Sequence, residues 1–363
     1  MTNESVIYIC KRQEFDVPEI KKPLVAEYQF EVKRCPQCKK KVSVKDNSHL
    51  KAPVQYGPKA KAVVSYLNVH NLIPKKRTAQ IMGDFFGMPI SVATVENFSK
   101  ACVAKVEPVV GQIETDLKAA PTKGADESGI RIAGKLFWLH TLSNKEHVYY
   151  YATEKRGDIK KDLKGIVVHD GFASYYKLED VQHALCNAHH LRELKAVAEI
   201  DKEPWARNMA RLLKVGNNTV EQSPQNITTE WLIKFKKLYD LIISKALSYH
   251  ENLGVLKKPK RGRVKRRPGH NLALRLQKYE EDVLRFLTNP EVPFTNNLAE
   301  QSIRMIKVKQ KISGCFRTAE GADQFLTVRS YTATAQKQGI RIIDALTHAF
   351  QGAPLLLAQK STN

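Results

Sequence analysis

The sequence predicts a multidomain α/β protein in which one mixed β-sheet is combined with several blocks of helix. Four short runs rich in β-branched and aromatic residues, typical of strands, follow one another between residues 124 and 170. Long segments with apolar residues at helical spacing precede and follow these runs. A strongly basic stretch without acidic residues, 257–270, separates two of the helical blocks.

The first 50 residues are polar and basic and contain one close cysteine pair, Cys35-Pro-Gln-Cys38. This spacing is typical of one half of a zinc ribbon, whereas a structural zinc site needs four ligands. The cysteine upstream, Cys10, has no partner at short spacing. We therefore describe residues 1–50 as a partial zinc-ribbon-like segment: either the first half lies outside this reading frame or the site is degenerate. A solvated turn with two free thiols is the alternative to zinc binding.

Residues 51–118 are expected to form a helical DNA-binding domain. The pattern is helical from Tyr56, Gly87-Met88-Pro89 breaks it, and Ser91 offers an N-cap for the next helix. Two helices joined by a short Gly/Pro turn describe a helix-turn-helix unit.

The strand-like runs are joined by short turns, except that a brief helix, 158–164, is expected before the last run. Three meandering strands followed by a helix and a strand predict the first half of a mixed α/β sheet. The four runs are 124–132, 136–142, 147–153 and 165–170.

Residues 188–256 are mostly helical by periodicity, with a polar interruption at 216–229. The basic arm that follows, 257–270, contains eight basic residues and two prolines, and suits a linker or a phosphate-binding arm. Further helices are expected at 271–288, 297–313 and 320–352.

The chain of 363 residues carries 59 Lys and Arg against 37 Asp and Glu, a net charge of +22. We favour nucleic acid as the partner, because each neutralised phosphate releases condensed counterions. A charge that only aids solubility, or that binds anionic lipid, is the alternative. No apolar stretch is long enough to span a membrane, no secretory signal is evident, and six cysteines in a long chain indicate reduced thiols or metal ligands. These features predict a cytoplasmic protein associated with the bacterial nucleoid.

Three acidic residues from separate elements are candidates for a metal-binding active site. Phosphodiester chemistry builds charge on the entering and leaving oxygens, and two divalent cations about 4 Å apart, held by carboxylates, can stabilise it. Asp126 lies in the first strand, Asp170 ends the fourth, and Glu300 lies in the first turn of a later helix, which Thr295 or Asn296 can cap. Each alone is more often structural, as a turn former or a partner of the helix dipole. Their combination with the basic charge suggests a catalytic site.

Seven longer strings occur in an order that matches a known family. They are YGPKAKAVVSYL (56–67), RTAQIMGDFFGMPISVATV (77–95), ADESGIRIAGKLFWLH (125–140), VVHDGFASY (167–175), HALCNAHHLRELK (183–195), NNLAEQSIRMIKVKQKISGCFRT (296–318) and RSYTATAQKQG (329–339). Over nearly its whole length the chain therefore resembles the IS66 family of insertion-sequence transposases.

The resemblance implies an RNase H-like catalytic domain at 119–352, with a helical insertion at about 180–290 and a tail at 353–363. Its DDE triad would be Asp126, Asp170 and Glu300, which bind Mg²⁺ or Mn²⁺. Such enzymes nick DNA at transposon ends with water, and the freed 3′-hydroxyl then attacks target DNA. A homo-oligomer on paired ends is expected, and accessory proteins of the same element are candidate partners.

The chain departs from the family string around the Glu, which often has Asp before the Asn pair and Arg after the Glu. Thr295 and Gln301 occupy these positions here. We expect an auxiliary contact to be lost while the carboxylate triad stays intact.

A cluster of possible zinc ligands follows the second Asp within a short stretch: His183, Cys186, His189 and His190. The Cys-x-x-His step resembles a signature of DDE transposases and could bind zinc or brace the active site. A strand-to-helix junction with a buried Cys and His is the alternative. His169, next to Asp170, is expected to point to the opposite face of the strand and to be structural.

Candidate DNA contacts fall into three groups. Those suited to base edges are Thr94, Asn97 and Lys100, on the second helix of the helix-turn-helix. Those suited to phosphates are Arg77 and, in the basic arm, Arg261, Arg263 and Lys265. Those expected near the scissile strand are Arg304, Lys307, Lys309, Lys311 and Arg317.

Two rival functions are consistent with the same residues. A nuclease of the same fold would cleave nucleic acid without joining it, and a non-catalytic relic of an insertion element would bind DNA without divalent-dependent chemistry.

Overall fold

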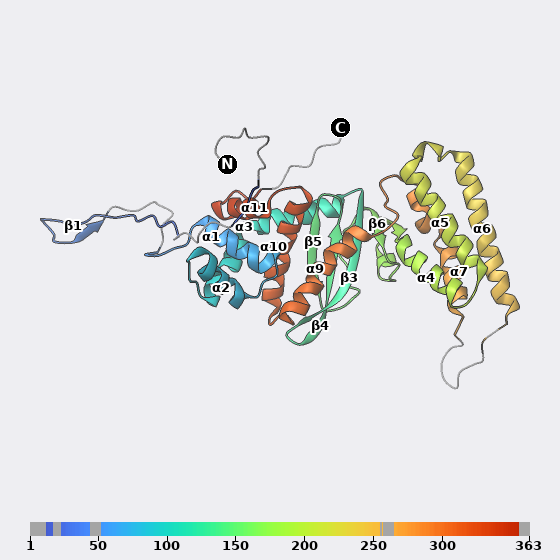
Figure 1. The fold of residues 1–363 in the computed structure, drawn as a ribbon, viewed down its shortest axis with the longest axis horizontal. Coiled ribbons are helices and arrows are strands. Elements are labelled where there is room, and N and C mark those ends of the chain that lie inside the picture. The colour runs from blue at the N-terminus through green and yellow to red at the C-terminus, as the bar shows by residue number, and fades with distance from the viewer. Residues whose placement is uncertain (1–11, 17–22, 44–51, 255, 257–264, 356–363) are drawn as a thin grey trace, which may run out of the picture.

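Figure 1 shows the computed structural model of the chain, which describes residues 12–16, 23–43, 52–254, 256 and 265–355. An N-terminal hairpin, a central α/β body and a helical arm follow one another along the longest axis. The hairpin pairs β1 (Val32–Arg34) with β2 (Lys41–Ser43) in antiparallel register. None of the helices in the described ranges combines the length and the apolar character needed to cross a membrane.

The central body is built on a five-stranded mixed sheet with the order β5-β4-β3-β6-β7. β3, β4 and β5 form an antiparallel meander, whereas β6 and β7 add on the other side of β3 in parallel. The bounds are β3 (Thr122–Ile132), β4 (Lys135–Ser143), β5 (Val148–Thr153), β6 (Gly165–His169) and β7 (Val181–Leu185). The mixed sheet and its first four strands are confirmed, and β7 is an additional strand that the sequence analysis lacks.

The brief helix expected at 158–164 is wrong, because the chain there is irregular. Ile159 and Leu163 are buried in the core and have the spacing of one helical turn, which explains the prediction. The backbone N–H of Lys160 instead donates to the hydroxyl of Tyr151, and that of Lys164 to the backbone oxygen of Lys118. These long-range hydrogen bonds replace the local ones of a helix.

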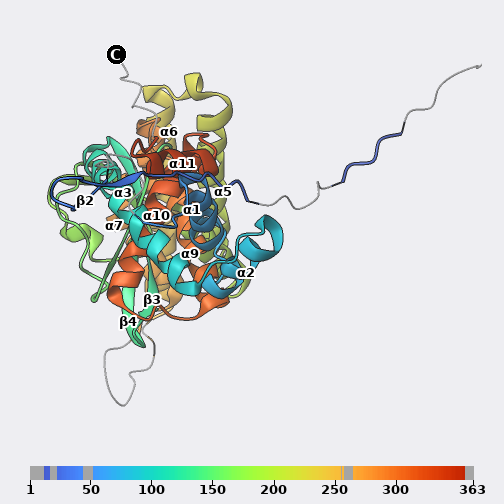
Figure 2. The ribbon, with the colours of Figure 1, turned by 90° about the vertical axis from the view of Figure 1, so that its left-hand side faces the viewer.

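Helices from both ends of the chain cover the meander side of the sheet (Figure 2). The N-terminal ones are α1 (Pro58–Ser65), a π-helical turn (Tyr66–His70), α2 (Lys75–Phe86) and α3 (Val92–Ala119). The C-terminal ones are α10 (Ala319–Lys337) and α11 (Ile342–Gln351). Side chains of α3, α10, α11 and the sheet share one buried core.

The turn between α2 and α3 has the structure that the sequence predicts. Gly87 ends α2 in the left-handed conformation, with φ of 58°. The hydroxyl of Ser91 accepts a hydrogen bond from the backbone N–H of Thr94 and so caps α3.

The edge strand β5 is protected by α10 through two hydroxyl groups. The Ser330 hydroxyl accepts a hydrogen bond from the backbone N–H of Tyr150, and the Thr334 hydroxyl accepts one from that of Val148. Backbone groups that an exposed edge would offer to another chain are therefore bonded within the molecule.

The helical arm consists of the five helices that follow β7, the segment in which the sequence analysis expects an insertion. They are α4 (Asn187–Glu199), α5 (Pro204–Gln222), α6 (Thr229–Asn252), α7 (Pro268–Lys278) and α8 (Glu280–Thr288). Their apolar faces form a second core, which includes Ile166 and Val168 of β6. After the arm, α9 (Asn297–Ser313) returns to the sheet and lies against β3 and β4.

Candidate active site

Asp126 and Asp170 lie at the same edge of the sheet because they follow paired positions of two parallel strands. Gly124 of β3 pairs with Val168 of β6, and each Asp lies two residues further along its own strand direction. Asp126 is half-buried within β3, opposite Thr141 of β4, whereas Asp170 is exposed just after β6. The pairing of β3 with β6 therefore places the carboxylate of Asp126, within β3, near that of Asp170, just after the end of β6.

The turn after β6 orients Asp170. Its Oδ1 accepts a hydrogen bond from the backbone N–H of Phe172 at 2.8 Å. Gly171 has a φ of +91°, a conformation that favours glycine, and its N–H donates to Nδ1 of His169. His169 is fully buried, and burial together with the neighbouring His183 lowers its pKa to about 3, so it stays neutral. Its burial and its hydrogen bonds fit the structural role that we expect of it.

Glu300 enters the site from the first turn of α9, and Asn296 sets its position. Asn296 is buried; its Nδ2 donates to the backbone oxygen of Ala125 at 2.8 Å, and its N–H donates to Sγ of Cys186 at 3.1 Å. Asn296 is the N-cap residue, but its side chain makes no cap hydrogen bond, so the expected capping role of this side chain is wrong. The side chain reaches across to the neighbouring strand instead.

The two oxygens of Glu300 face different groups. Oε1 lies 3.6 Å from Sγ of Cys186 and 3.8 Å from Nδ1 of His189. Oε2 lies 4.0 Å from the guanidinium of Arg192 and 3.9 Å from that of Arg304. Thiol, imidazole and guanidinium groups therefore surround a carboxylate that is mostly buried.

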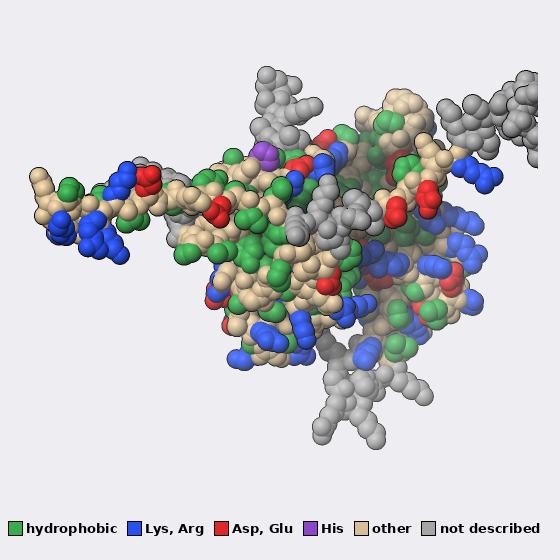
Figure 3. All heavy atoms as spheres, turned by 60° about the vertical axis from the view of Figure 1, so that its left-hand side comes forward, with side chains coloured by type: hydrophobic (Ala, Val, Ile, Leu, Met, Phe, Trp, Pro, Cys, Tyr) green, Lys and Arg blue, Asp and Glu red, His purple; other side chains and the backbone are tan. Residues whose placement is uncertain are grey.

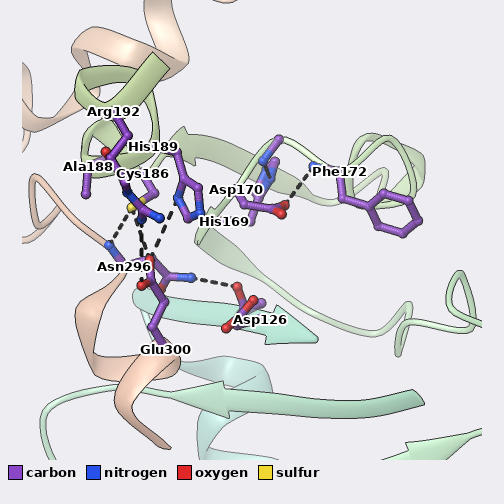
Figure 4. A network of polar contacts seen from close by, with 12 residues as sticks. Asp126, His169, Asp170, Phe172, Cys186, Ala188, His189, Arg192, Asn296 and Glu300 are labelled. Carbon is purple, nitrogen blue, oxygen red and sulfur yellow. Dashed lines mark hydrogen bonds and ion pairs between the residues drawn. The ribbon is translucent and has the colours of Figure 1, made fainter. Parts of the chain in front are cut away.

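Figure 4 shows Asp126, Asp170 and Glu300 around one space between β3, the end of β6 and the start of α9. Burial, together with the negative charges of Glu127, Asp170 and Glu300, raises the pKa of Asp126 to about 7. Like charges and burial disfavour the ionised carboxylate, and a divalent cation bound among these oxygens would relieve both effects. Oxygen donors from three separate elements fit the preferences of Mg²⁺ and Mn²⁺.

The sequence analysis does not predict a hydrogen-bond network around the buried side chain of Glu127, next to the candidate site. Glu127 accepts hydrogen bonds from Nε and NH2 of Arg156 on Oε1, at 2.9 and 2.7 Å, and from the Tyr175 hydroxyl on Oε2, at 2.7 Å. The Arg156 guanidinium lies 3.9 Å from the centre of the Phe172 ring. The network thus links the strand of Asp126 to the turn of Asp170. An acidic residue at a strand position whose side chain faces the core is the signal that could have revealed it.

The possible zinc ligands do not all meet: His190 is buried, with its Nδ1 3.1 Å from Oδ1 of Asn187. Cys186 and His189 meet Glu300, as described above. His183 instead lies beside His169, with 3.1 Å between Nδ1 of His183 and Nε2 of His169. Near the N-terminus, Cys35 and Cys38 flank the turn between β1 and β2, where the backbone N–H groups of Cys38 and Gln37 lower the pKa of the Cys35 thiol.

The candidate base-reading residues lie along the first half of α3. Asn97 and Lys100 are exposed, and Thr94 is half-buried with its hydroxyl 2.9 Å from that of Ser91. Arg77 is exposed on α2. Lys265 is exposed, whereas Arg261 and Arg263 lie outside the described residues.

The basic residues of α9 differ in what they contact. Arg304 and Lys311 are exposed, and Arg304 pairs with Glu300. Lys307 donates to the backbone oxygen of Gly129 and so is engaged within the fold. Lys309 lies about equally far from the rings of Phe316 and Phe325, at 5.9 and 5.8 Å.

Positively charged side chains of α2, α3 and α9 lie near one another and near Arg317, which follows α9. Burial and the charges of Arg317 and Lys100 lower the pKa of Lys75, and burial and Lys75 lower that of Lys309. Lys75 is a cation of this group that the sequence analysis lacks. Figure 3 shows Lys and Arg side chains spread over the body and the helical arm, with Asp and Glu more scattered on the same face.

A family model described as "Transposase IS66 family" matches residues 53–324, which is more than half of the chain. The match includes all three carboxylate positions and both helices of the helix-turn-helix. No curated protein sequence matches the chain. The chain belongs to the IS66 family of DDE transposases.

Proposed function

We propose that this protein is an active DDE transposase, which nicks DNA at transposon ends and joins the freed strand to target DNA. The observation that carries the proposal is the meeting of Asp126, Asp170 and Glu300 around one space, from three separate elements. The strand order, with a three-stranded meander extended by two parallel strands, supports an RNase H-like core for residues 119–352, into which the helical arm is inserted.

The triad would bind two divalent cations, Mg²⁺ or Mn²⁺. Such ions stabilise negative charge on the attacking and leaving oxygens of the phosphodiester. Asp126, with its pKa near 7, would bind such a cation as the carboxylate, because the positive charge favours the ionised form. Asn296 and the Glu127–Arg156 pair act as positioning residues, because they fix Glu300 and the Asp170 turn relative to β3.

DNA binding is assigned to residues 51–118 together with the basic surface of α9. Asn97 and Lys100 are exposed on the second helix of the helix-turn-helix, which in such units lies in the major groove. The neighbouring cations Lys75, Lys309 and Arg317 suit phosphates, and Lys75 also forms an ion pair with Glu96. Because two transposon ends must be paired, the active form would be a homo-oligomer, with accessory proteins of the element as further candidate partners.

The test is cleavage and joining of labelled DNA that carries the ends of the element, in Mg²⁺, in Mn²⁺ and in EDTA. We expect metal-dependent nicks at the element boundary and joined products, and loss of both in Asp170→Asn. Asp180→Asn, an exposed Asp outside the site, is the matched control and should retain activity. Nicks without joined products would support the nuclease, and binding without any cut would support the non-catalytic relic.

A further inference from the structure

A set of metal-ligating side chains lies directly beside the proposed triad (Figure 4). Among the described residues, Cys186, His189 and Glu300 form the one group of three such side chains whose donor atoms all lie within 4.8 Å of one another. The Asp126, Asp170 and Glu300 carboxylates are more widely spaced than this. A thiol and an imidazole favour a softer ion than the oxygen donors of the triad do.

The spacing of these donor atoms fits tetrahedral coordination. With Zn–S and Zn–N or Zn–O bonds of usual length, neighbouring ligands of a tetrahedral Zn²⁺ lie roughly 3.4 to 3.6 Å apart. The observed distances from Oε1 of Glu300 are 3.6 Å to Sγ of Cys186 and 3.8 Å to Nδ1 of His189. These two distances differ from the expected ones by a few tenths of an ångström at most, and Sγ of Cys186 lies within 4.8 Å of Nδ1 of His189.

The ring nitrogen of His189 that faces Glu300 has no hydrogen-bond partner among the residues that the structure describes. Nδ1 of His189 is buried and makes no hydrogen bond, which is unusual for a buried polar atom. Metal coordination would satisfy it. Sγ of Cys186, in turn, accepts a hydrogen bond from the N–H of Asn296, as a thiolate ligand can.

We propose that Cys186, His189 and Glu300 bind one Zn²⁺ ion, with a water molecule at the fourth position. Coordination replaces the S–H bond of Cys186 by a sulfur–zinc bond, and the proton leaves to solvent. The Arg192 and Arg304 guanidinium groups face the other oxygen of Glu300, so Oε1 is the oxygen that reaches the ion. Both arginines are largely exposed.

This zinc site would control the proposed catalysis, because it shares Glu300 with the triad. A carboxylate held by Zn²⁺ through Oε1 is less available to a catalytic cation. Zinc occupancy would therefore hold the enzyme in an inhibited state, and removal of zinc would release Glu300. This consequence rests on the proposed function, whereas the zinc site itself does not.

The binding test uses Co²⁺ as a spectroscopic substitute for Zn²⁺. The full-length protein with Cys35→Ser and Cys38→Ser is titrated with Co²⁺, so that the N-terminal pair cannot contribute. We expect a thiolate-to-cobalt charge-transfer band that saturates at one equivalent and disappears when Zn²⁺ is added. Further substitution of Cys186→Ser or His189→Gln should remove or strongly weaken it, whereas Asp170→Asn should leave it intact. Circular dichroism of each variant checks that it is folded.

No band, or a band that persists in Cys186→Ser, would overturn the zinc site. The second measurement is the zinc concentration that halves cleavage in excess Mg²⁺, which should rise about tenfold or more in His189→Gln, as loss of a coordinating contact predicts. An unchanged value would overturn the inhibitory role. A band without any cleavage activity would instead leave the site standing and reject the proposed function.

Discussion

The amide Nδ2 of Asn296 donates a hydrogen bond to the backbone oxygen of Ala125 at 2.8 Å, across 171 positions of sequence. This contact joins the start of α9 to β3 one residue before Asp126. The two residues thereby fix the distance between Glu300 and the sheet that carries the other two carboxylates. A loss of this hydrogen bond should affect the site more than the rest of the fold.

Asn296→Ala should lower the free energy of unfolding by about 1–3 kcal/mol, because it leaves the buried oxygen of Ala125 without its donor. We also expect metal-dependent cleavage to fall by more than the loss of folded protein explains, since Glu300 is no longer held. Urea denaturation and end cleavage measure the two effects. Asn297→Ala is the control, because Asn297 is exposed in the same string. Equal effects of both substitutions would contradict the positioning role.

Gly124 is required because Asn296 lies against its α-carbon. A Cβ at this position would lie 2.3 Å from Oδ1 of Asn296 and 3.3 Å from Cβ of Ala299. Gly124→Ala should therefore displace α9 and reduce both stability and cleavage. Gly111→Ala is a matched control with the opposite expectation: a Cβ there meets nothing within 4 Å, and Ala stabilises a helix interior by up to about 1 kcal/mol. Thermal unfolding measures both variants: we expect the Tm to fall in Gly124→Ala and to stay the same or rise in Gly111→Ala.

Local patterns predict much of this fold from the sequence. The helical periodicity predicts α9 over the residues that form it. The runs rich in β-branched and aromatic residues predict β3, β4 and β5 to within about two residues, the usual precision for the ends of such elements. The errors occur where local and long-range hydrogen bonds compete. Residues 158–164 have apolar side chains at helical spacing, but their backbone bonds to distant residues. β7 is short, and a polar Gln and His lie within it, so its pattern is weak.

In the candidate site, too, features set by local sequence are predictable and features set by long-range contacts are not. Asp126 lies within β3, and its nearness to Asp170 depends on the parallel pairing of β3 with β6. Asp170 is predictable as a candidate, because α/β sheets commonly place active groups at the carboxyl ends of strands. The roles of Asn296 and Glu127 are not, because their partners are distant in sequence and local reasoning makes an Asn before a helix a cap. The cation Lys75 is likewise recognisable only from the fold, which brings its charge close enough to lower the pKa of Lys309.

The raised pKa of Asp126 predicts a pH-dependent stability of the metal-free protein. The pKa is about 7 in the fold against a usual 3.8, so the unfolded chain loses this proton at lower pH than the folded chain does. Ionisation therefore costs stability, and the cost grows as the pH rises from 3.8 to about 7. In EDTA, Asp126→Asn should raise the Tm at about pH 8 and change it little at about pH 4.

Asp180→Asn provides the comparison, since Asp180 is exposed outside the site and its substitution should be neutral at both pH values. Mg²⁺ should stabilise the wild type more at the higher pH, where the carboxylate it binds is already ionised, and should do so less for Asp126→Asn. An equal Tm gain of Asp126→Asn at both pH values would show that the gain does not come from removing a buried, ionised carboxylate.

Asn97 and Lys100 should contribute differently to DNA binding, although both are exposed on α3 one helical turn apart. If Asn97 reads a base edge, Asn97→Ala should weaken binding to the transposon end by about 1–3 kcal/mol and leave binding to unrelated DNA almost unaffected.

Lys100 lies 3.7 Å from Glu320 and near Lys75, among the neighbouring cations of α2 and α9. If it contacts phosphate, Lys100→Ala should weaken binding to both DNAs and reduce the salt slope by about 1. Titrations at several salt concentrations separate these outcomes, with Lys234→Ala on the distant α6 as the control. A sequence-independent loss in Asn97→Ala would assign α3 to backbone contacts and move base reading to another element.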